Sequence, residues 1–104
     1  MVRILRAARR MHGVKKRIVY IIRSQSDPSR YYTGITSDVN GRLEWHNSGP
    51  SGYTVHNRPW SLVVSIEFPT ENAARRFEKY LKSGSGRAFS KRHFEPGDHR
   101  PDAR

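Results

Sequence analysis

Five polar side chains in the 104-residue sequence could together hydrolyse a phosphodiester bond. Tyr20 and Tyr32 lie in two β-branched, aromatic segments, and Arg42 and His46 are helical neighbours at i, i+4. Glu78 lies at the flank of a later apolar stripe. A carboxylate binds a hard divalent cation through oxygen, an arginine neutralises charge that grows on phosphate, and a tyrosine or histidine takes a proton from water. These five residues are therefore the candidates for catalysis and metal binding.

Spacing alone leaves a purely structural interpretation open for each candidate. Tyrosines on strands mostly pack or face solvent, and an arginine and a histidine four residues apart usually form a solvated pair. Glu78 is preceded by Arg75 and Arg76 and followed by Lys79, so a local ion pair of small energetic value is its simplest role.

The elements that must position these residues form one α/β (α+β) domain with the order ββαβαα. Strands are predicted over 18–22, 31–36 and 60–68, and the turn residues between the first two predict a hairpin. Helices are predicted from an Asp38 N-cap to about Asn47, from a Thr70 cap to about Ser83, and after 83–86, with a loop over 48–59. The expected architecture is a small, mainly antiparallel three-stranded sheet flanked by helices. The helix after Asp38 is predicted to face inward with Val39, Leu43 and His46. The helix after Thr70 is predicted to face inward with Ala73, Phe77, Tyr80 and Leu81.

The charge of the chain is concentrated at its N-terminus. Twenty Lys and Arg against nine Asp and Glu give a net charge of +11, and residues 1–17 contain seven of the positive charges and no acid. We divide the chain into a basic arm (1–16), a folded domain (17–94) and a loose tail (95–104). The arm could bind nucleic acid, lie on a membrane surface, act as a transit peptide, precede a true start at Met11, or be a solvated tail.

Composition excludes several classes of protein. The absence of cysteine removes disulfide scaffolds and thiolate zinc sites, and the histidines have no zinc-binding spacing. No apolar run approaches the roughly 20 residues that span a bilayer, so no membrane-spanning segment is predicted. Apart from the membrane-surface interpretation of the arm, no membrane partner is expected. We expect a cytoplasmic, nucleoid-associated bacterial protein with a polyanionic partner.

Four blocks of the sequence resemble the GIY-YIG nuclease family. They are Val19-Tyr20-Ile21 with Tyr31-Tyr32-Thr33-Gly34, the stretch 35–49, the segment Arg58-Pro59-Trp60-Ser61-Leu62-Val63, and the helix with Glu78. The resemblance covers residues 17–94. It is to the small single-domain branch, whose members are similar to the N-terminal domain of the excinuclease C protein.

This resemblance implies a role for each of the five candidates. Tyr32 would be the general base and Tyr20 its partner near the attacking water, and Arg42 would contact the scissile phosphate. His46 would assist proton transfer or phosphate contact, and Glu78 would ligate Mg²⁺ or Mn²⁺. Because tyrosine has an ordinary pKa of about 10, a tyrosine base needs help from nearby positive charge.

The sequence departs from the family pattern in two places. The first signature reads Ile18-Val19-Tyr20 rather than Gly-Ile-Tyr, which keeps the tyrosine. Some members also use a late polar residue, often asparagine, where this chain offers Arg87, Ser90 and Lys91. The nearby segment 83–87 resembles a phosphate cradle but lacks the P-loop spacing, so a capping linker between helices is expected.

The leading hypothesis is a metal-dependent endonuclease that acts on DNA, branched or damaged, in repair or processing. RNA is an open alternative substrate, and no protein partner is assigned. A non-catalytic nucleic-acid-binding module on the same fold is the alternative function. The residues predicted to contact nucleic acid are Arg9, Arg10, Lys15, Lys16, Arg17, Tyr53, His56, Arg87 and Lys91.

Overall fold

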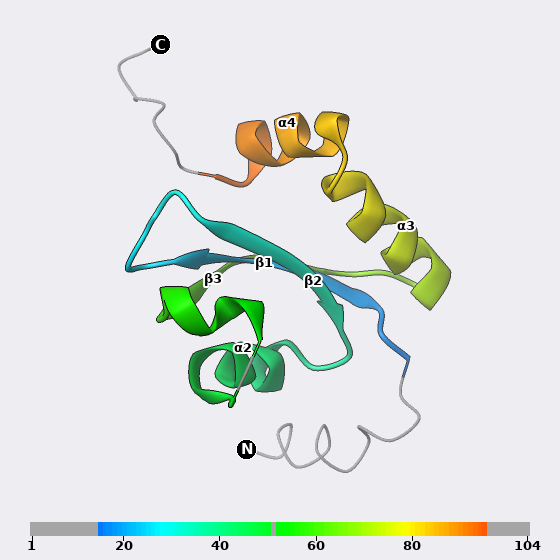
Figure 1. Ribbon diagram of the computed structural model, residues 1–104. Helices are drawn as coiled ribbons and strands as arrows, with labels where there is room; N and C mark the ends of the chain where they lie inside the picture. The colour runs from blue at the N-terminus through cyan, green and yellow to red at the C-terminus, as the bar shows by residue number, and fades with distance from the viewer. Residues whose placement is uncertain (1–14, 51, 96–104) are drawn as a thin grey trace.

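The computed structural model describes residues 15–50 and 52–95, and its elements follow the predicted order ββαβαα. Figure 1 shows the chain coloured from its N-terminus to its C-terminus. The elements are β1 (Ile18–Ser24), β2 (Tyr31–Thr36), α2 (Val39–Ser48), the 3₁₀ helix η1 (Tyr53–Asn57), β3 (Trp60–Glu67), α3 (Glu71–Leu81) and α4 (Gly84–His93). No helix in these two ranges is long and apolar enough to cross a membrane.

The sheet has three strands in the order β2-β1-β3, and both pairings are antiparallel. The central strand β1 is covered on both faces, which explains why its sequence is apolar at consecutive positions. Tyr20 on β1 is opposite Gly34 on β2 and Ser65 on β3. The predicted hairpin and antiparallel sheet are confirmed.

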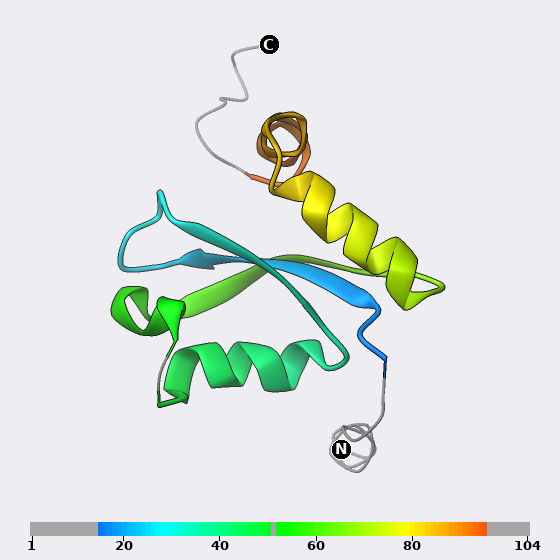
Figure 2. The same cartoon turned by 45° about the vertical axis from the view of Figure 1, so that its right-hand side comes forward.

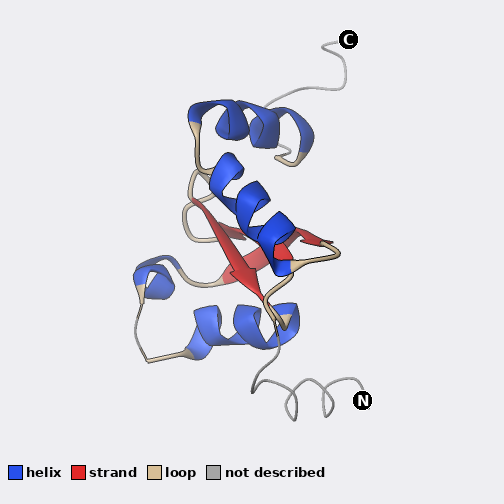
Figure 3. Cartoon of the chain, turned by 90° about the vertical axis from the view of Figure 1, so that its right-hand side faces the viewer, coloured by secondary structure: helices blue, strands red, loops and turns tan. Residues whose placement is uncertain are grey.

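The helices divide between the two faces of the sheet. In Figures 2 and 3, α2 and η1 lie on one side of the strands and α3 and α4 on the other. Each face has its own buried cluster. Val19, Ile21, Ala74 and Leu81 form the cluster under α3 and α4, and Tyr20, Ile22 and Trp60 form the one under α2 and η1.

A side-chain cap starts each of α2, α3 and α4. Asp38 accepts a hydrogen bond from the Gly41 amide at 3.2 Å, as its predicted N-cap role requires, and Thr70 accepts one from Ala73 at 3.1 Å. Ser83 caps α4 by accepting from the Gly86 amide at 3.2 Å. Ser83 therefore has the capping role that the sequence predicts, and residues 84–86 form the first turn of α4.

Two details of the sequence prediction are wrong. The second helix buries Ala74 rather than Ala73 against the sheet, and Tyr80 is 39% exposed because it lies at the rim of the aromatic cluster. The segment predicted as loop before Pro59 contains η1, which places Thr54 in the interior.

Candidate active site

A buried chain of hydrogen bonds joins three elements under the α2 face of the sheet. The Tyr20 hydroxyl on β1 is 2.7 Å from Nε2 of His46 on α2, and His46 Nδ1 is 2.8 Å from Oγ1 of Thr54 on η1. All three side chains are only 1% exposed. Because both ring nitrogens of His46 have a partner, the position and orientation of its imidazole are fixed.

A glycine in β2 makes room for Tyr20. A Cβ atom built on Gly34 would lie 2.5 Å from the Tyr20 hydroxyl oxygen and 2.6 Å from Cζ, closer than real Cβ contacts allow. A residue without a side chain is therefore required at position 34, because the Tyr20 ring occupies the space of a Cβ atom. This packing brings the Tyr20 hydroxyl across β2 to His46.

Hydrogen bonds between side chains and backbone groups hold α2 and η1 against the start of β3. Trp60 donates its indole N–H to the Thr54 carbonyl at 2.8 Å, and the Trp60 amide donates to Asn47 Oδ1 at 2.6 Å. Arg58 donates to the carbonyl oxygens of His46 and Gly49, each at 2.6 Å. These bonds fix the backbone on both sides of the His46–Thr54 contact.

Burial shifts the titration of both partners in the Tyr20–His46 pair toward their neutral forms. It raises the pKa of Tyr20 to about 12, although the neighbouring Arg42 guanidinium opposes the shift. Burial, together with the positive charges of Arg42 and Arg58, lowers the pKa of His46 to about 4. At neutral pH the pair is therefore an uncharged tyrosine hydrogen-bonded to an uncharged histidine.

Tyr32 and Arg42 lie beside this pair, at the accessible side of the site. The Tyr32 ring is 4.9 Å from the His46 ring and 6.4 Å from the Tyr20 ring, measured between centroids. Tyr53 from η1 stacks on Tyr32, with 6.1 Å between the ring centroids. The Arg42 guanidinium lies over the Trp45 ring at 4.4 Å, which supports the side chain on α2.

Glu78 lies in the opposite layer, close enough for its charge to act on Tyr20. It lies on α3, its side chain is 19% exposed, and its negative charge contributes to the raised pKa of Tyr20. Lys82, one helical turn later, donates to it at 2.6 Å. The local ion pair anticipated as an alternative therefore exists, with Lys82 rather than with the residues next to Glu78.

The donor set around Glu78 fits a magnesium-type ion. Within 15–50 and 52–95 no group of three or more His, Asp or Glu side chains could hold a metal by itself. Mg²⁺ does not need such a group, because it keeps several waters and is commonly held by one or two carboxylates together with substrate phosphates. Glu78 would supply the hard oxygen ligand, and a phosphodiester would supply others.

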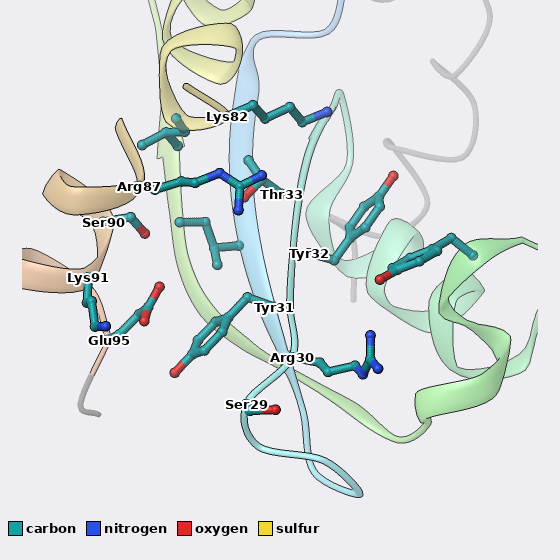
Figure 4. A pocket seen from close by; sticks show the side chains of 13 residues that line it. Ser29, Arg30, Tyr31, Tyr32, Thr33, Lys82, Arg87, Ser90, Lys91 and Glu95 are labelled. Atoms are coloured by element: carbon teal, nitrogen blue, oxygen red, sulfur yellow. The ribbon is translucent and has the colours of Figure 1, made fainter. Parts of the chain in front are cut away.

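The predicted nucleic-acid contacts fall into three groups. Tyr53, Arg87 and Lys91 line a cavity of about 580 Å³ beside Tyr32 (Figure 4). His56 is exposed on η1 and does not line this cavity. Lys15, Lys16 and Arg17 are exposed before β1, where Arg17 pairs with Glu67, whereas Arg9 and Arg10 lie outside the described residues.

Sequence reasoning missed Thr54 and Arg58 as supports of the site. Thr54 lies in a segment without hydrophobic periodicity, and its partner His46 is eight residues away. Arg58 belongs to one of the blocks that resemble the family, but that resemblance assigns it no role. A buried histidine needs partners for two ring nitrogens, and that requirement was the available signal for a nearby hydroxyl.

Comparison with known proteins agrees with this arrangement. The GIY-YIG catalytic domain matches residues 16–93. The chain belongs to the GIY-YIG family. A UPF0213 protein of Halalkalibacterium halodurans is 37% identical over 70 residues, covering 66% of this chain and 72% of that protein. No solved structure matches the chain.

Longer relatives share the same domain. A "structure-specific endonuclease subunit SLX1" of Candida dubliniensis is 38% identical over 82 residues, and the slx1 protein of Talaromyces stipitatus is 42% identical over 65. These alignments cover 72% and 57% of the GIY-YIG chain described here, but only 27% and 17% of the fungal proteins. The chain therefore spans a minor part of these relatives.

Proposed function

We propose that this GIY-YIG protein is a divalent-metal-dependent endonuclease that hydrolyses DNA phosphodiester bonds. The observation that carries the proposal is the Tyr20–His46 hydrogen bond at 2.7 Å, with Tyr32 and Arg42 beside it and Glu78 on α3 close enough for its charge to act on Tyr20. The family membership and the fungal structure-specific endonuclease subunits support the same activity.

The two tyrosines have different roles in this proposal. Tyr20 is buried, bound to His46 and has a pKa of about 12, so it positions the reactants rather than accepting a proton. Among the described residues no hydrogen bond involves the Tyr32 hydroxyl, and Tyr32 lines the cavity of Figure 4. Tyr32 is therefore the proposed general base. In this role Tyr32 accepts a proton from the attacking water.

Arg42 and Glu78 act on the phosphate. Arg42 binds the scissile phosphate and neutralises the negative charge that grows on it as water attacks. Glu78 is the ligand for Mg²⁺ or Mn²⁺. Its carboxylate becomes available to the ion when the ion pair with Lys82 breaks. When bound, such an ion supplies Lewis-acid stabilisation of the phosphate and of the leaving oxygen.

The function is tested by cleavage of supercoiled, single-stranded and branched DNA with Mg²⁺ or Mn²⁺, against EDTA. We expect metal-dependent cleavage that falls about 100–1,000-fold in Arg42→Ala, since one electrostatic contact to a transition state has that value. Glu78→Gln should lose cleavage while it keeps DNA binding, and Glu71→Gln, on the same helix, is the matched control.

The alternative function, a binding module without catalysis, predicts a different result. In that case no DNA is cut with either metal, yet binding is tight and sensitive to salt. Equal cleavage by the wild-type protein and Glu78→Gln would point to a contaminating nuclease and would overturn the proposed assignment.

A further inference from the structure

A basic groove lies directly beside the proposed catalytic tyrosine. The cavity of about 580 Å³ runs between β2 and α4, and four cationic side chains line it against one acid, Glu95. We call this cavity the β2–α4 groove; its cationic residues are Arg30, Lys82, Arg87 and Lys91 (Figure 4).

Two of these cations have no ion-pair partner among the described residues. Arg30 pairs with Asp27 and Lys82 pairs with Glu78, whereas Arg87 and Lys91 are unpaired there. Arg87 and Lys91 are also four residues apart on α4 and both line the groove. Like charges at this spacing repel each other unless an anion lies between them. Their arrangement therefore fits a bound phosphate.

An exposed aromatic ring also lines the groove. Tyr53 is 62% exposed, which is unusual for a tyrosine that packs for stability, and one of its faces is stacked on Tyr32. An open ring face beside cationic side chains is the arrangement with which proteins bind bases of single strands.

The size of the groove and the exposed Tyr53 ring together favour unpaired nucleotides over an intact duplex. The volume is in the range of small-ligand pockets, about 300–1,000 Å³, which suits a few nucleotides. The bases of an intact duplex are stacked on one another and offer no free face to a tyrosine, whereas an unpaired base does.

We infer that the β2–α4 groove binds an unpaired segment of a nucleic-acid strand next to the scissile phosphate. A base stacks on Tyr53, and phosphates of the same strand lie against Arg87 and Lys91. Two residues that line the groove also connect it to the proposed reaction centre: Tyr32 belongs to the site, and Lys82 pairs with Glu78. A strand bound in the groove therefore leads directly to that centre. That last placement rests on the proposed function, but binding in the groove does not.

The experiment measures binding of the full chain in EDTA to three labelled DNA probes by fluorescence anisotropy. The probes are a single strand, a blunt duplex, and a duplex with a single-stranded flap whose first unpaired nucleotide is 2-aminopurine. Tyr53→Ala should weaken binding of the single strand and the flap about tenfold, since stacking on one aromatic side chain has about that value. Binding of the blunt duplex should change less than about twofold, because no base of it reaches the ring.

Matched variants separate the groove from general charge and from the fold. Tyr53→Phe keeps the ring, so it should bind the flap as the wild-type protein does and quench 2-aminopurine fluorescence, whereas Tyr53→Ala should not quench it. Arg87→Ala should weaken flap binding more than Arg92→Ala, which removes the same charge from the same helix outside the groove.

Opposite results overturn the inference. They are unchanged flap binding in Tyr53→Ala, equal weakening on blunt duplex and flap, or equal effects of Arg87→Ala and Arg92→Ala. Ring-dependent flap binding without metal-dependent cleavage supports the groove and overturns the proposed function. Metal-dependent cleavage that is indifferent to Tyr53 supports the proposed function and overturns the groove.

Discussion

The two faces of the sheet use different interactions to bury the same strand. Under α3 and α4, Val19 and Ile21 of β1 meet Ala74, Leu81 and a set of aromatic rings, with contacts that are almost entirely apolar. Under α2 and η1, the alternate residues of β1 include Tyr20, which is held by hydrogen bonds through His46 to Thr54.

The difference shows what each face contributes. Apolar contacts are non-directional, so the α3–α4 face supplies stability and tolerates changes that conserve volume. Hydrogen bonds fix direction, and a buried group that loses its partner is destabilising. The α2–η1 face is therefore suited to hold a hydroxyl and an imidazole in one orientation beside a reacting phosphate.

The apolar face should show the largest effect of truncation. Phe77 packs against Phe68 at 5.2 Å, Tyr80 at 6.0 Å and Phe89 at 6.3 Å. Phe77→Ala should lower the free energy of unfolding by about 3–4 kcal/mol, and Phe77→Leu by about 1.5 kcal/mol or less. Urea denaturation checks both variants. Equal losses in the two would contradict the view that volume alone matters on this face.

The hydrogen-bonded face should make stability depend on pH through His46. Its pKa is lowered to about 4, so between pH 6.5 and 4 the unfolded chain binds a proton that the folded chain does not. This contribution is complete above about pH 6.5 and is lost as the pH falls toward 4. It amounts to about 3 kcal/mol over that interval, because one pKa unit corresponds to about 1.4 kcal/mol.

Denaturation of wild-type protein and His46→Gln at pH 7 and pH 4 isolates this contribution. The variant should lose about 3 kcal/mol less than the wild type over the interval, whatever its absolute stability. The carboxylates of Asp27 and Glu71, whose pKa values are lowered by hydrogen bonds, are present in both proteins, so their contributions cancel. Parallel pH profiles would show that His46 titrates normally and is not buried as described.

A smaller effect should separate shape from hydrogen bonding at Thr54. Thr54→Val keeps the volume but leaves His46 Nδ1 without its partner at 2.8 Å, so stability should fall by about 1–2 kcal/mol. Thr54→Ser keeps the hydroxyl and should restore the pH dependence assigned to His46. If valine were tolerated as well as serine, the Tyr20–His46–Thr54 chain would not position the site.

The sequence was sufficient for most of the elements because their signals are local. The second strand was predicted at its observed bounds, 31–36, and the Asp38 and Thr70 caps were predicted from residue type and position. Tyr20, Tyr32 and His46 were also predicted as neighbours, since antiparallel pairing places the two tyrosines on one face.

The supports of the site could not be predicted because they depend on tertiary contacts. Thr54 meets His46 only after α2 and η1 pack together, and nothing in the segment 48–59 has the periodicity of an element. Ala73 and Ala74 differ by about 100° around α3, and only the docking angle of that helix selects the buried one. The partner of Glu78 was likewise chosen by side-chain geometry, one turn away at Lys82.

Two adjacent tyrosines allow the most direct test of which face holds the chemistry. Tyr31 and Tyr32 are consecutive on β2 and point to opposite faces, Tyr31 to the apolar cluster and Tyr32 to the site (Figure 4). The same substitution, Tyr to Phe, removes one hydroxyl from each. The measurement is the single-turnover cleavage rate of a branched DNA with saturating Mg²⁺. We predict a loss of about 100-fold or more in Tyr32→Phe, the usual value of a general base, and less than about threefold in Tyr31→Phe. Equal rates in the two variants would contradict the assignment of the chemistry to the α2–η1 face.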